Sequence, residues 1–158
     1  MGVEGWSDFF VAVAGASAAL AGLIIVAMSV NIETIVKSRA LTARAGATIG
    51  VLMLVVLVSV LALVPGVPSG VAGGGIVALA VAALAITADT TVRELRDNLG
   101  QGMLKSAVLI VPAVAFLIGG IMVAAAVPNG AYALALGTIL AFAGGVLNAW
   151  VLLVEIRR

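Results

Sequence analysis

Three long stretches of the chain contain no charged residue, and their lengths restrict the fold more than any other feature. They cover residues 9–32, 45–88 and 106–154. A helix needs about 20 apolar residues to cross a hydrocarbon core about 30 Å thick. The first stretch is therefore one membrane span long, whereas each of the other two is about two spans long and must fold back once.

Turn residues mark the places where the two longer stretches reverse. The segments 65–70 (PGVPSG) and 128–130 (PNG) combine proline, which lacks a backbone donor, with residues that tolerate positive φ angles. The sequence therefore predicts a single transmembrane domain, residues 1–158, with five helices. The predicted spans are about 9–30, 45–64, 71–88, 106–127 and 131–154.

The overall composition favours the same class of protein. Apolar residues make up 64% of the chain and charged residues 9%, whereas a soluble domain averages about half apolar and a quarter charged. We therefore expect an all-α fold, a polytopic membrane helix bundle.

The positions of the basic residues predict how this bundle is oriented. With five spans, all eight bases fall on one side: Lys37, Arg39, Arg44, Arg93, Arg96, Lys105, Arg157 and Arg158. The positive-inside rule makes that side the cytoplasm, with the N-terminus outside and the C-terminus cytoplasmic. We expect a multi-pass protein of the bacterial inner membrane, with anionic lipid headgroups facing its bases.

The segment 89–105 between the third and fourth spans is the most polar part of the chain. Thr91 and Glu94 have capping-box spacing, and apolar residues recur at helical intervals, so the segment predicts a cytoplasmic amphipathic elbow. Such an elbow could dock a partner or anionic headgroups, or it could simply connect two spans.

Small residues recur at every fourth position in two of the predicted spans. Span one carries Ala14, Ala18 and Gly22, and span five carries Gly137, Ala141 and Gly145. Such stripes let helix backbones approach closely in lipid. They could pack within one chain or between copies. We expect a homo-oligomer because five spans within one chain leave part of these small-residue faces uncovered.

Residues that usually carry chemistry are scarce. The chain has no histidine and no cysteine, and no ionisable residue falls within the predicted hydrocarbon zone, so we expect no enzyme, no metal, no cofactor and no nucleic-acid partner. Hydroxyl groups in the spans are expected to donate to the carbonyl four residues earlier. Asn148 cannot satisfy its amide so easily, which predicts an interhelical hydrogen bond or a wet cavity.

Three carboxylates lie where odd-numbered spans reach the cytoplasm: Glu33, Asp89 and Glu155. In an oligomer they could form the acidic mouth of a cation pathway. They could equally be surface pairs, since Lys37, Arg93 and Arg158 follow at helical spacing. If span one lines a pore, its polar candidates are Ser17, Ser29 and Asn31.

Two resemblances involve the first span. The segment 6–31 (WSDFFVAVAGASAALAGLIIVAMSVN) resembles the first helix of an uncharacterised family of small bacterial multi-span proteins, some labelled as modulators of a membrane-bound AAA protease. This resemblance implies a non-catalytic accessory role.

Residues 17–28 (SAALAGLIIVAM) are also similar to the pore-lining first helix of the Orai calcium channels. The chain departs from that family in three ways: the filter glutamate would fall at Val30, the Orai helix enters from the cytoplasm, and Orai has four spans. The calcium-filter role is therefore not carried over.

The sequence leaves two functional hypotheses. The protein is either a homo-oligomeric pore or cation pathway lined by the first helix, or an accessory subunit that packs against a larger membrane complex. A pore needs a polar stripe facing a symmetry axis, whereas an accessory protein needs only a complementary helix face.

Overall fold

The computed structural model describes residues 3–37, 39–97 and 102–156, and all of its regular elements are helical. A short 3-10 helix, η1 (Val3–Trp6), leads into α1 (Ser7–Val30) and α2 (Ile32–Lys37). Four longer helices follow: α3 (Arg39–Leu63), α4 (Ser69–Asp97), α5 (Gly102–Ala124) and α6 (Gly130–Ile156). The predicted all-α fold class is confirmed.

Four helical segments are long and apolar enough to cross a membrane: Ser7–Val30, Ala45–Leu63, Ser69–Ala88 and Gly130–Trp150. They match the predicted first, second, third and fifth spans. The apolar segment found in α5, Ile110–Ala124, is shorter than these within the described residues. The length and composition of these helices indicate a membrane protein.

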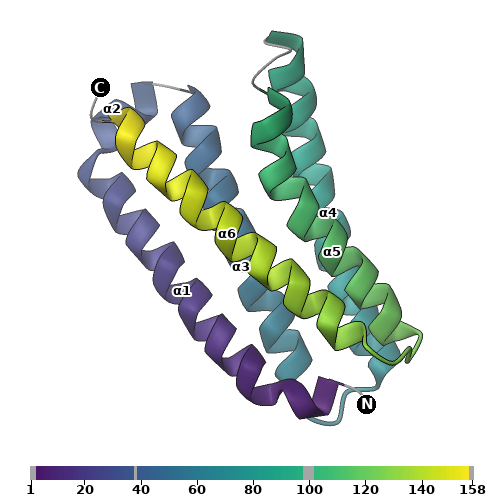
Figure 1. Ribbon diagram of the computed structural model, residues 1–158. Helices are drawn as coiled ribbons and strands as arrows, with labels where there is room; N and C mark the ends of the chain where they lie inside the picture. The colour runs from purple at the N-terminus through teal and green to yellow at the C-terminus, as the bar shows by residue number, and fades with distance from the viewer. Residues whose placement is uncertain (1–2, 38, 98–101, 157–158) are drawn as a thin grey trace.

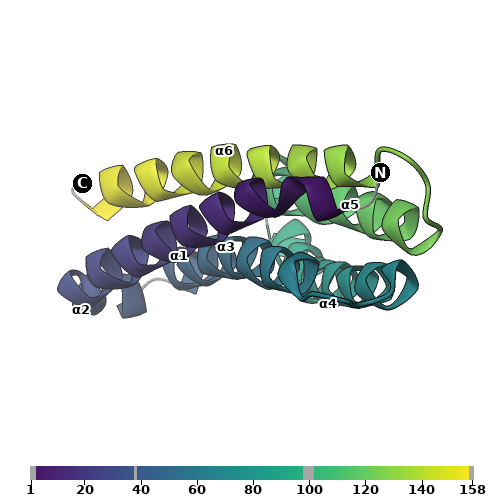
Figure 2. The same ribbon diagram turned by 90° about the horizontal axis from the view of Figure 1, so that it is seen from below.

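Helices α3 to α6 form a four-helix arrangement, and α1 packs outside it against α3. Figure 1 shows α4 and α5 as one hairpin on one side, with α6 passing in front of α3 and α1 running along the other side. In Figure 2, α6 lies in a layer above α3 and α4. The α3–α4 and α5–α6 turns lie at the end where α1 begins, whereas α6 ends at the opposite end (Figure 1).

Both predicted turns lie between helices. Gly66 has φ +75° in the α3–α4 turn, and Ala126 (φ 52°) and Asn129 (φ 78°) lie in the α5–α6 turn. The N–H of Val127 donates to the carbonyl of Met122 at 2.9 Å, and that of Ala126 to Val123 at 3.0 Å. These two bonds form a Schellman motif, which satisfies the last carbonyls of α5.

The segment expected to form an amphipathic elbow has a different structure in its first half. Helix α4 continues without a break through Ala88 to Asp97, so residues 89–97 extend a spanning helix and do not form a separate element. The physical reason is that no proline or glycine interrupts the chain between Gly75 and Gly100. Residues 98–101 of the predicted elbow lie outside the described residues.

The core lies inside the four-helix arrangement, where glycines bring backbones together. A Cβ at Gly120 in α5 would lie 3.0 Å from the backbone nitrogen of Val77 in α4, and one at Gly119 would lie 3.0 Å from the backbone nitrogen of Leu134 in α6. Phe116 is fully buried in the same core. Since no hydrophobic effect drives helices together in lipid, this close approach is what holds the bundle.

Aromatic side chains join α1 to α6 at the end where α1 begins. The ring of Trp6 lies 4.7 Å from that of Tyr132 and 5.5 Å from that of Phe9, both edge to face. Edge-to-face geometry is the favoured one for aromatic pairs. This contact fixes one end of α1 against α6.

Candidate functional site: the outer face of α1

Helix α1 is attached to the rest of the bundle along one side. Its buried residues, Phe10, Ser17 and Ala21, recur at intervals of seven and four, which places them on one face. That face packs against α3. The opposite side of α1 is exposed along its length in the described chain.

We call this side the outer face of α1 and define it by residues that are all exposed and spaced by three or four: Val11, Gly15, Ala18, Gly22, Val26 and Ser29. A Cβ added at Gly15 or Gly22 would meet no atom within 4 Å. The outer face is therefore both open and shallow at its centre. Shallow helix faces are the ones that allow another helix to approach closely in lipid.

The two predicted small-residue stripes have different structural roles. In span five, Ala141 is fully buried, a Cβ at Gly137 would lie 3.1 Å from the ring of Phe116, and one at Gly145 would lie 3.4 Å from the side chain of Leu52. That stripe packs within the chain.

In span one, Ala18 and Gly22 are exposed on the outer face, and Ala14 lies half-buried at its edge. The first-span stripe is therefore free to contact another molecule, whereas the fifth-span stripe is not.

The three predicted pore-lining residues do not lie on one face. Ser17 is fully buried on the side of α1 that meets α3, and its hydroxyl has no hydrogen-bond partner among the described residues. Asn31 is half-buried and donates from Nδ2 to the carbonyl of Ala27 at 2.9 Å. Only Ser29 lies on the outer face, where its Oγ donates to the carbonyl of Ile25 at 2.9 Å.

The expected hydroxyl bonds are present at several other positions. Thr87 donates to the carbonyl of Ala83 at 2.7 Å, and Thr138 donates to that of Leu134 at 3.0 Å. Both bonds return to the helix four residues earlier, as predicted for Ser29 as well. Asn148 is buried in α6, with 9% of its surface exposed.

Of the three predicted acidic-mouth residues, the structure describes the side chain of Glu33 alone. Glu33 is exposed in the first turn of α2, just beyond the outer face of α1, and Lys37 is exposed at the end of the same helix. Asp89 falls in α4 and Glu155 in α6, but their side chains lie outside the part that the structure describes. The acidic ring therefore stays a prediction.

Helix α2 is held against α3 and not against the outer face. The hydroxyl of Thr42 donates to the carbonyl of Ile35 at 2.9 Å, and the buried side chains of Ile35 and Ala45 pack together with Met28. This contact places Glu33 on the surface beside the end of α1. Among the described residues, no group of three acidic, histidine or cysteine side chains could hold a metal ion.

The sequence did not lead us to predict the close contact between the backbones of Gly73 in α4 and Ala124 in α5. The signal was available in the runs of consecutive glycines in the two helices, three at residues 73–75 and two at residues 119–120.

Comparison with known proteins finds no matching family model, no matching curated protein and no matching solved structure. The resemblances of the first helix therefore stay predictions.

Proposed function

We propose that the protein is a non-catalytic membrane protein that acts by lateral association, using the outer face of α1 to contact the same face of a second copy. The homo-oligomer formed in this way is an accessory assembly for a larger membrane complex. The observation that carries this proposal is the open outer face, with Gly15, Ala18 and Gly22 at its centre.

The proposed topology has five spans, with the N-terminus outside and the C-terminus in the cytoplasm of a bacterial inner membrane. It is supported by the turns that share one end of the bundle with the start of α1 (Figure 1). It is also supported by the bases, which all belong to the opposite end under this topology. In this orientation Glu33 and Lys37 face the cytoplasm.

Single-cysteine cross-linking in membranes tests the association directly, because the chain has no cysteine of its own. Ala18→Cys lies on the outer face and should give a disulfide-linked dimer under mild oxidation. Ala16→Cys is also exposed, but it lies about 120° away from Gly22 around the helix at about 100° per residue. It should give no dimer. Equal dimer formation by both variants would contradict the proposed interface.

A cation pathway is the second candidate function, in which several copies would arrange the outer face of α1 around a symmetry axis and not in direct contact with one another. It is favoured by Ser29, which lies on the outer face, and by Glu33, which is exposed immediately beyond it. The rest of that face is small and apolar, so such a pathway would be narrow and hydrophobic and would gate by dewetting. Its test is ion flux through the purified protein in liposomes, and flux no higher than in empty vesicles would leave the association function alone.

A further inference from the structure

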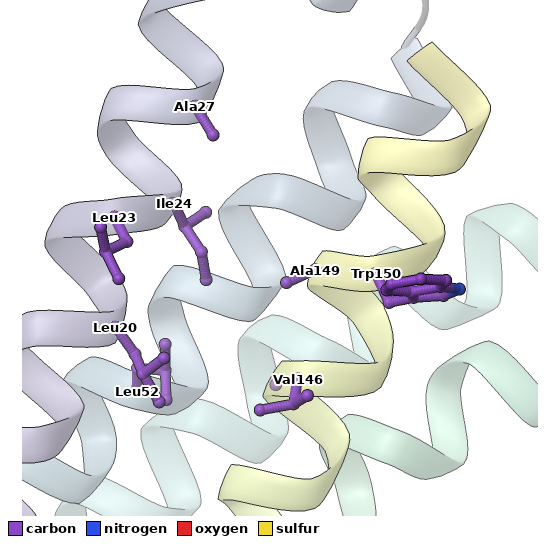
Figure 3. Close-up of a pocket in the computed structure, with 9 residues that line it drawn as sticks. Leu20, Leu23, Ile24, Ala27, Leu52, Val146, Ala149 and Trp150 are labelled. Atoms are coloured by element: carbon purple, nitrogen blue, oxygen red, sulfur yellow. The ribbon is translucent and has the colours of Figure 1, made fainter. Parts of the chain in front are cut away.

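A groove separates α1 from α6 beyond the aromatic contact that joins them. It has a volume of about 280 Å³ and is lined by Leu20, Leu23, Ile24, Ala27, Leu52, Gly145, Val146, Ala149 and Trp150. In Figure 3, Ile24 points from α1 toward α6 and Ala149 points from α6 toward α1, with Leu52 of α3 below. Every lining side chain is apolar apart from the indole N–H of Trp150.

This lining selects the chemistry of an occupant. A polar ligand would lose its hydrogen bonds with water and find no replacement among these side chains. An apolar occupant has no such cost. The groove is open to the surroundings of the bundle, because Leu23, Val146 and Trp150 at its rim are all exposed. In a membrane, those surroundings are lipid.

The shape of the rim distinguishes a lipid chain from a helix. The large side chains of Leu23, Val146 and Trp150 are exposed at the rim and would keep the backbone of a second helix away, whereas a hydrocarbon chain is much thinner than a helix. The outer face of the same helix is lined by glycine and alanine, as close helix contacts require.

We propose that this groove binds one hydrocarbon chain of a membrane phospholipid, which packs between α1 and α6. The small side chains of Ala27, Gly145 and Ala149 leave the space above Leu52 that the chain would fill. Under the proposed orientation the groove lies in the cytoplasmic half of the bilayer, and only this choice of leaflet rests on the proposed function.

Filling the groove tests this proposal. The double variant Ala27→Leu/Ala149→Leu places two larger side chains in it, and the matched control Ala12→Leu/Ala143→Leu makes the same change at exposed positions that do not line it. Each protein is stripped of lipid in detergent, and its melting temperature is measured with and without dioleoylphosphatidylglycerol. Native mass spectrometry of the same samples records the lipid that each chain retains.

We expect the wild-type protein and the control to retain the lipid and to melt at a higher temperature in its presence. The filled variant should lose both effects while keeping the helical circular dichroism of the wild type. If the double variant does not fold, the single Ala27→Leu variant replaces it and should show the same loss.

Three results would overturn the proposal. The wild type could retain no lipid, or the filled variant could retain as much as the wild type. Alternatively, the filled variant could keep its lipid but lose oligomeric mass, which would identify a helix as the occupant. A failure of the outer-face association would leave the lipid retention and the melting temperatures unaffected, because they concern the opposite edge of α1.

Discussion

The backbone of Gly73 in α4 lies directly against the backbone of Ala124 in α5. A Cβ at position 73 would come within 2.6 Å of both the Cα of Ala124 and the carbonyl oxygen of Gly120. Real side chains never approach backbone atoms so closely, so the α4–α5 hairpin depends on the missing side chain.

Replacing Gly73 with alanine should therefore destabilise the protein. The added methyl group meets backbone atoms that cannot rotate away, so we expect a loss of about 1 to 3 kcal/mol in the free energy of unfolding. The neighbouring Gly74 provides the control, since a Cβ there would meet nothing within 4 Å. Gly74→Ala should be neutral or stabilise by up to about 1 kcal/mol. Thermal unfolding in detergent measures both, and equal effects would contradict the packing described.

Ser17 gives a prediction that separates structure from conduction. Its buried hydroxyl has no partner among the described residues, and burial of an unpaired hydroxyl costs about 1 to 3 kcal/mol in proteins. Ser17→Ala should therefore raise the melting temperature and leave any ion flux unchanged. A lower melting temperature would show that the hydroxyl makes a bond, and a loss of flux would show that it lines a pathway.

Substitution of Glu33 tests the cation-pathway function most directly. A ring of carboxylates raises the local cation concentration within the ~8 Å Debye length of physiological salt. Under that candidate, Glu33→Lys should reduce cation flux in liposomes more than Glu33→Gln, and high salt should narrow the difference. A surface pair with Lys37 would be worth only about 0.2 to 0.5 kcal/mol, and both variants would then leave flux unchanged.

The orientation predicts which positions are accessible from outside the cell. Cysteines placed singly at Ser7 and Ser69, both exposed at the end where α1 begins, should react with a membrane-impermeant maleimide in intact cells. One placed at Ser38 should react only after the cells are opened. Labelling of Ser38 in intact cells would reverse the topology, and labelling of all three would contradict the five-span arrangement.

The helix ends at the two turns could be predicted from the sequence, but the end of α4 at Asp97 and the partners of the helix faces could not. Proline and glycine act through local backbone geometry, so the turns after Leu63 and Ala124 follow from the nearby residues alone. The stripes containing Gly22 and Gly137 look alike in sequence, because the same small residues serve contacts inside and outside a chain. Phe116 covers one of them and nothing in the described chain covers the other.

The same limit applies to the polar residues of the first span. The spacing of these residues could be read from the sequence. The side of α1 that meets α3 could not, because it depends on the packing of Phe10 and Ala21, which places Ser17 on the buried side. A rotation of the helix by half a turn would have produced an equally apolar buried face. Hydropathy therefore could not choose between the two, and only the packing against α3 does.

The central claim is that the outer face of α1 joins two copies of the chain, and the mass of the protein released in mild detergent tests it most directly. Gly22→Ile adds a branched side chain at the centre of that face, where a Cβ would meet no atom of the chain within 4 Å. Ala16→Ile adds the same side chain at an exposed position away from it. We predict that the wild type and Ala16→Ile share one oligomeric mass and that Gly22→Ile has a smaller one. If Gly22→Ile kept the wild-type mass, or if the wild type were monomeric, the claim would be contradicted.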